Sequence, residues 1–169
     1  MTPMIDVMER LTHLRKETDA LRLYALIDGA QYETRRGKRL ERQAGRYPLF
    51  DGTPDAPLAH AGPWVIDAEA AGDAFTSDIA ALEREAAAVC WVIALQSLEG
   101  LSQLLQLNLD TKLPDGRTAL VRFWDPRVLA SLAEVLTPVQ REEFFGHIHE
   151  WHLLHKGQRA WIGRPNANA

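Results

Sequence analysis

The stretch that decides the fold is residues 90–136, CWVIALQSLEGLSQLLQLNLDTKLPDGRTALVRFWDPRVLASLAEVL. Its apolar run from Cys90 to Leu95 predicts a buried strand, and Ser97 is placed to cap the leucine-spaced helix that follows. Pro114-Asp115-Gly116 predicts a tight turn, because proline presets φ and glycine accepts a positive φ. A strand, a helix and a hairpin turn therefore follow one another within this stretch.

Further strands are predicted on both sides of this turn. The run from Thr118 to Trp124 predicts a strand that ends at Asp125-Pro126, the N-cap and first residue of another helix. Upstream, Leu21–Ile27 and Trp64–Ile66 are β-prone segments. Because helices separate the strands, we expect parallel crossovers, with the hairpin adding an antiparallel member. The predicted class is α/β, with helices packed on a mixed sheet.

The remaining elements fit one domain over residues 1–169. Apolar spacing predicts an N-terminal helix over 3–17, and a helix face runs from Phe75 to Val89. Thr137-Pro138-Val139-Gln140 is typical of a capping box, with proline at the first helical position. The C-terminal segment, residues 150–169, is expected to contain an edge hairpin around Lys156-Gly157.

Composition limits the function classes. The chain has 169 residues, 46% of them hydrophobic, and a net charge of −4, whereas nucleic-acid and anionic-membrane binders need a basic surplus. We therefore expect no nucleic-acid and no membrane partner. The single cysteine, Cys90, and the lack of a secretory signal fit a cytoplasmic protein.

Four histidines form the most conspicuous cluster of candidate metal ligands. His147, His149, His152 and His155 lie within nine residues, and two pairs are spaced i, i+3. Their spacing is irregular, and the only cysteine is in the apolar run. We expect a polar C-terminal segment here and no metal site.

Three aspartates define the alternative, an enzyme. Asp28, Asp51 and Asp125 each follow an apolar segment and are expected at one edge of the sheet, where paired carboxylates hold a metal or share a proton. A small metal-dependent hydrolase using this set is the alternative hypothesis. Each aspartate is also explained as a turn or an N-cap, and Ser97 lacks the flanking glycines of a nucleophile elbow. We expect no catalytic residue and no cofactor.

The basic segment 33–46 and the single Arg122 are candidates for charge interactions. Residues 33–46 carry six basic and two acidic side chains, a local charge of +4 that suits an acidic protein surface or forms a solvated face. Within it, Arg35, Arg36, Arg39 and Arg42 are the candidate partner-binding residues. Arg122 lies inside the expected strand. If both faces of that strand are covered, Arg122 must be paired, and Asp28, Glu99 and Asp125 are the possible partners.

Six segments together closely resemble the adaptor, or effector-chaperone, domain of bacterial type VI secretion systems, a family long catalogued as a domain of unknown function. They are YALIDGAQ (24–31), PLFDGTP (48–54), LAHAGPWVI (58–66), WVIALQSLEGL (91–101), LPDGRTALVRFWDPRVL (113–129) and LTPVQREEFFGHI (136–148). The resemblance covers roughly residues 20–150. The positions that match the family pattern are Asp28, Gly29, Gly52, Gly62, Pro63, Trp64, Gly116, Phe123, Asp125, Pro126 and Arg127.

The resemblance implies a non-enzymatic cytoplasmic protein. Members of this family bind a cognate toxic effector and help to load it onto the spike protein VgrG. The expected partners are therefore a secreted toxin effector and the VgrG spike.

Overall fold

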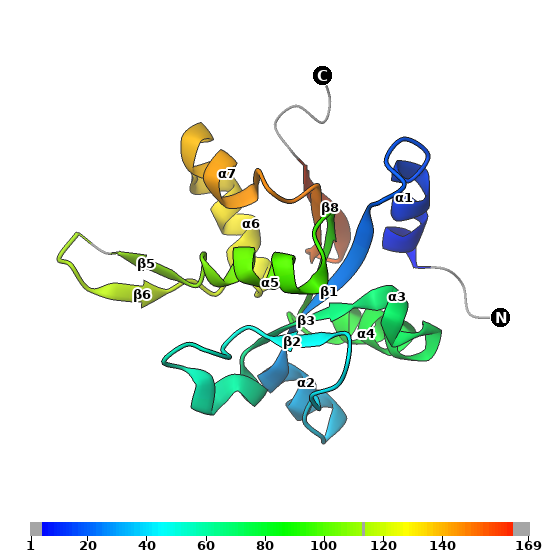
Figure 1. Ribbon diagram of the computed structural model, residues 1–169, viewed down its shortest axis with the longest axis horizontal. Helices are drawn as coiled ribbons and strands as arrows, with labels where there is room; N and C mark the ends of the chain where they lie inside the picture. The colour runs from blue at the N-terminus through cyan, green and yellow to red at the C-terminus, as the bar shows by residue number, and fades with distance from the viewer. Residues whose placement is uncertain (1–4, 113, 164–169) are drawn as a thin grey trace.

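The computed structural model describes residues 5–112 and 114–163. A six-stranded sheet lies at its centre, and helices pack on both faces (Figure 1). The helices are α1 (Asp6–Leu14), α2 (Gly29–Arg36), the 3-10 helix η1 (Ala56–Ala61), α3 (Ala68–Ala71), α4 (Asp73–Glu85), α5 (Leu98–Gln106), α6 (Pro126–Val135) and α7 (Pro138–Phe145). The strands are β1 (Arg22–Asp28), β2 (Arg46–Pro48), β3 (Pro63–Asp67), β4 (Val89–Ala94), β5 (Asp110–Lys112), β6 (Thr118–Leu120), β7 (Glu150–His155) and β8 (Gln158–Gly163). The predicted α/β class is confirmed.

The strand order of the large sheet is β2-β3-β1-β4-β7-β8, and every neighbouring pair is antiparallel. The expectation of parallel neighbours is therefore wrong. Strands β3 and β4 flank β1 and both run against it, so the connection through α3 and α4 does join strands of the same direction. Strand β1 occupies the place between them, which leaves only antiparallel contacts.

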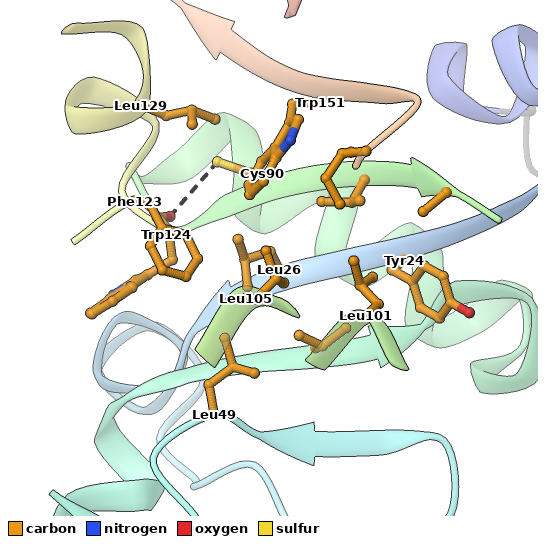
Figure 2. Packing of buried hydrophobic residues seen from close by; sticks show 14 of the residues in the cluster. Tyr24, Leu26, Leu49, Cys90, Leu101, Leu105, Phe123, Trp124, Leu129 and Trp151 are labelled. Atoms are coloured by element: carbon orange, nitrogen blue, oxygen red, sulfur yellow. Dashed lines mark hydrogen bonds between the residues drawn. The ribbon is translucent and has the colours of Figure 1, made fainter. Parts of the chain in front are cut away.

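The first face of the sheet carries an aromatic core covered by α5, α6 and α7. Figure 2 shows side chains of this core, among them Phe123, Trp124 and Trp151. Side chains of Leu26 and Trp151 point to this face and meet Phe123, whose ring lies 6.1 Å from that of Trp151 in an edge-to-face arrangement. The Cys90 thiol lies 3.7 Å from the carbonyl oxygen of Trp124. Burial raises the pKa of this thiol, so it remains protonated and acts as a small apolar side chain.

The second face is covered by the N-terminal helices and by α4. Alternate residues of β1, including Leu23 and Ile27, point to this side and pack with Leu11 of α1 and Ile79 of α4. Helix α4 ends at Glu85, so the expected helical face is four residues too long and Val89 begins β4 instead. The predicted N-terminal helix is confirmed over Asp6–Leu14, and residues 3 and 4 lie outside the described part of the chain.

The turn at 114–116 joins a hairpin that does not enter the large sheet. Strands β5 and β6 form a two-stranded sheet of their own and project from the body of the molecule (Figure 1). Strand β6 ends at Leu120, four residues before the predicted end. The chain must leave the strand there because Phe123 and Trp124 are both buried in the core.

The predicted helix starts are confirmed by their hydrogen bonds. The Ser97 hydroxyl accepts from the Gly100 N–H at 3.2 Å. Thr137 and Gln140 form the reciprocal capping box. The C-terminal hairpin is also confirmed, and its strand β8 is the last strand of the large sheet.

Ion pairs bind α1 to the C-terminal hairpin. The Arg10 guanidinium donates to both oxygens of the buried Glu150 carboxylate, at 2.9 and 2.7 Å, and His152 Nε2 lies 3.0 Å from Glu150 Oε1. Arg159 of β8 similarly joins Asp6 of α1 to Glu83 of α4. Burial alone would raise the pKa of Glu150, but the bonds from Arg10 and His152 outweigh it and lower the pKa to about 2.

This network makes stability depend on pH through Glu150. Because the folded pKa lies below the unfolded one, the contribution of Glu150 is complete above pH ~4.5 and disappears as the pH falls toward about 2. Glu150→Gln should lower the free energy of unfolding by about 1.5–3 kcal/mol at pH 7. The loss should shrink at pH 3, measured by urea denaturation. Glu134→Gln, at an exposed site on α6, is the matched control and should have little effect at either pH.

Candidate functional site

Asp28 and Asp125, the carboxylates of the alternative enzyme hypothesis, are buried at the starts of two helices. Asp28 accepts hydrogen bonds from the N–H groups of Ala30 and Gln31, at 3.0 and 3.2 Å, and so caps α2. Asp125 caps α6 by accepting from the Arg127 N–H at 2.9 Å. Both carboxylates therefore have structural partners inside the chain.

Two arginines lie over this carboxylate pair. The Arg127 guanidinium binds both oxygens of Asp125, at 3.0 and 2.8 Å. Arg122 Nη2 lies 3.5 Å from Asp28 Oδ2. Asp28, one of the three possible partners, is thus the partner of Arg122. The predicted place of Arg122 in a strand is wrong, because it follows β6, and 57% of its side chain is exposed.

The pKa values of the Asp28 and Asp125 carboxyl groups are shifted in opposite directions. Burial raises the pKa of Asp28, and the nearby charge of Asp125 adds to that rise. Burial also acts upward on Asp125, but the hydrogen bonds from Arg127 outweigh it and lower the pKa of Asp125 below its ordinary value. A raised and a lowered carboxyl side by side are typical of acid–base sites, yet capping and ion pairing account for both shifts here.

Asp51, the third aspartate, belongs to a different ion pair. Its carboxylate is bound by both terminal nitrogens of the Arg42 guanidinium, and this pair lowers the pKa of Asp51. Over the described ranges 5–112 and 114–163, no three histidine, cysteine or acidic side chains form a group that could hold a metal ion. The arrangement expected of a metal-dependent hydrolase is therefore not assembled by Asp28, Asp51 and Asp125.

The histidines lie along and before β7, so helical i, i+3 spacing does not apply to them. His152 is buried and contacts Glu150, whereas His155 is exposed at the end of the strand. His147 lies in the loop after α7 and lines a small hollow there. Neighbouring residues of a strand point to opposite faces, which separates these side chains.

The basic segment is largely neutralised inside the molecule. Arg36 contacts Asp78 and Glu85 of α4, at 3.0 and 2.8 Å. The pairs Arg39–Glu33 and Arg42–Asp51 are more exposed. Three of the four candidate partner-binding residues thus have carboxylate partners within the chain, and their role in binding remains a prediction.

Arg35, the fourth candidate, is exposed on α2. Lys38 follows the helix and is also exposed. A shallow hollow of about 240 Å³ opens nearby, lined by Leu40, Arg42 and His60 among others. The positive charges that remain available to a partner are therefore fewer than the sequence indicates.

Exposed apolar side chains concentrate in the second half of the chain. Among the described residues, four of the seven large ones lie between residues 107 and 139, namely Leu107, Leu120, Val135 and Val139. Leu107, just past α5, is 78% exposed, and Val139 of α7 is 69% exposed. Ordinary surfaces scatter such residues singly, whereas a group of them marks an interaction site.

Leu107 borders a hollow between α5 and α7. This hollow has a volume of about 110 Å³, and its lining includes Leu104, Leu107 and Phe144. Glu143 also lines it, and Val139, one turn earlier on α7, shares that helix face. We call Leu104, Leu107, Val139, Phe144 and this hollow the α5–α7 surface. It is a concave and largely apolar feature that can accept a side chain of another protein.

Sequence reasoning did not find the α5–α7 surface, although a signal was present. The run LLQLNL (104–109) places more leucines than one helical stripe can bury. Leu105 and Leu109 are buried, while Leu107 is left in solvent. The surplus leucine was the sign of an exposed apolar site.

The ion pairs of the basic segment predict two distinct outcomes on charge reversal. Arg36→Glu would place an acid beside Asp78 and Glu85 and should lower the melting temperature by about 2–4 °C. Arg35→Glu, on the same helix but exposed, should leave the melting temperature unchanged. Equal effects of the two variants, measured by thermal unfolding, would contradict the structural role of Arg36.

The comparisons with known proteins give one match. A family model, described as a domain of unknown function (DUF4123), matches residues 23–143. No curated protein and no solved structure matches the chain. The matched region includes β1 apart from Arg22, all of β4, the caps at Asp28 and Asp125, and α7 as far as Glu143. The chain therefore belongs to the DUF4123 family.

Proposed function

We propose that this protein is an adaptor, or chaperone, that binds a cognate type VI secretion effector and helps to load it onto the VgrG spike. The segments quoted from residues 24–148 support this role through their resemblance to such adaptors. The observation in the structure that carries it is the α5–α7 surface, where Leu107 is exposed at the edge of a hollow and Val139 is exposed on α7, one turn before Glu143 of its lining. A protein whose task is to hold a partner needs such an apolar contact in its free state.

The polar groups at the sheet edge support a binding role over a catalytic one. Asp28 and Asp125 are occupied as helix caps and ion-pair partners. A general acid or a metal ligand must keep an oxygen available for a substrate or an ion. We therefore propose that the chain is not an enzyme.

The projecting hairpin β5–β6 adds to the proposed contact area. Its residues are mostly exposed, and Leu120 of β6 is one of the exposed apolar side chains. A two-stranded hairpin gains stability when a further surface packs against it. The proposed site of action is the cytoplasm, and no described helix has the length and apolar character needed to cross a bilayer.

Substitution on the α5–α7 surface tests the proposed function. The probe is the effector toxin whose gene is expected beside this one, purified separately from the chain and titrated with it by calorimetry. Leu107→Asp and Val139→Asp should each weaken binding at least about tenfold, which corresponds to about 1.4 kcal/mol. Both side chains are exposed, so the melting temperature should not change.

Leu58→Asp is the matched control, because Leu58 is an exposed leucine on η1 that does not line the hollow between α5 and α7. It should bind like the wild type. Deleting the gene should also reduce soluble toxin and its delivery while other cargo is still secreted. Undiminished solubility and delivery of the toxin would contradict the adaptor role, whereas unchanged binding by Leu107→Asp would contradict only this surface.

A further inference from the structure

Strand β8 forms one edge of the large sheet and has a single neighbour, β7. The two strands are joined by the two-residue turn Lys156-Gly157, whose φ angles of 53° and 79° are typical of a type I′ hairpin. In such a hairpin the closing pair, His155 and Gln158, is hydrogen-bonded. The backbone groups of Ala160 and Ile162 then form hydrogen bonds with β7 as well.

The backbone groups of the alternate residues point away from the sheet. These residues are Arg159, Trp161 and Gly163. Within the described part of the chain, no further backbone hydrogen bond reaches them. Unpaired N–H and C=O groups in a row are a template for another extended strand.

The opposite edge of the sheet is protected against pairing with a further strand, whereas the β8 edge is not. The edge strand β2 has three residues and ends at Pro48, which has no N–H to offer. Strand β8 has six residues without proline or lysine. Its one charged residue, Arg159, forms ion pairs with Asp6 and Glu83, so its charge does not prevent another strand from pairing at this edge.

The side chain of Trp161 is fixed beside this edge. Arg10 lies 5.1 Å from the centre of its ring, and His152 stacks at a tilt 5.5 Å away. The ring nevertheless remains 53% exposed. A rigid backbone edge and a held aromatic ring lose little conformational entropy when a strand is added.

We propose that β8 pairs with β8 of a second copy of this chain, antiparallel across a two-fold axis. With Trp161 opposite the same residue of the second copy, Arg159 lies opposite Gly163 in both directions. This register brings together two aromatic rings and opposes no like charges within β8, and the Arg10 guanidinium beside each ring is already paired with Glu150. The edge is therefore self-complementary. The proposal does not depend on the adaptor role.

Sedimentation velocity across about a hundredfold range of protein concentration tests the pairing. The mass should rise from 19.0 kDa toward twice that value. Trp161→Lys places two ammonium groups opposite each other and should remain monomeric throughout. Leu120→Lys is the matched control, since it introduces lysine at an exposed apolar site of the separate β5–β6 sheet, and it should dimerise like the wild type.

Amide hydrogen exchange on the wild-type chain tests the pairing without a substitution. The Ala160 and Ile162 amides, bonded to β7, should be protected at every concentration. The Trp161 and Gly163 amides should gain protection only as the dimer forms. A mass that stays at 19.0 kDa, a dimer unaffected by Trp161→Lys, or outward amides already protected in the monomer would each overturn the proposal.

Discussion

Strand β1 is the constraint on which the rest of the structure depends. It is paired on both edges, with β3 and β4, and its residues from Leu23 to Asp28 are buried. A strand buried on both faces cannot place a polar side chain along its length without a partner. Its only acid, Asp28, comes at the end, where the N–H groups of α2 satisfy it.

The same constraint explains the tight passage from β1 to α2. A Cβ atom on Gly29 would lie 2.2 Å from the His60 carbonyl oxygen, so only glycine allows the two segments to approach. The Gly29 N–H also donates to the Gly62 carbonyl at 2.8 Å. The backbone around Asp28 is therefore tightly packed, which agrees with the role of Asp28 as a helix cap better than with a catalytic role.

The sequence predicted what local chemistry determines and missed what packing determines. Asp125-Pro126 and Thr137-Pro138 were found as helix starts because the capping residue and proline act within one turn. Strand direction was missed, since inserting β1 between β3 and β4 is a long-range choice that no local pattern records. Arg122 was misplaced because the apolar run around it continues past the strand into core residues of a loop.

The ion-pair partners of several arginines lie far along the chain, so a local count of charges does not show them. Arg36 reaches α4, and Arg159 joins α1 to α4, so a local sum of charges overstates what a partner meets. The surplus positive charge of residues 33–46 thus serves the fold in large part. What the surface offers a partner is more apolar than the composition indicates.

An exposed apolar surface also makes the protein that carries it prone to self-association. On α7, the exposed Val139 is followed by Glu142 and Glu143, and Glu134 precedes Val135 at the end of α6. Two copies meeting through this region would bring like acidic charges together, which opposes self-association there. Strand β8 opposes no such charges. This charge pattern agrees with both proposals, the pairing of two copies at the sheet edge and the binding of a different protein at the α5–α7 surface.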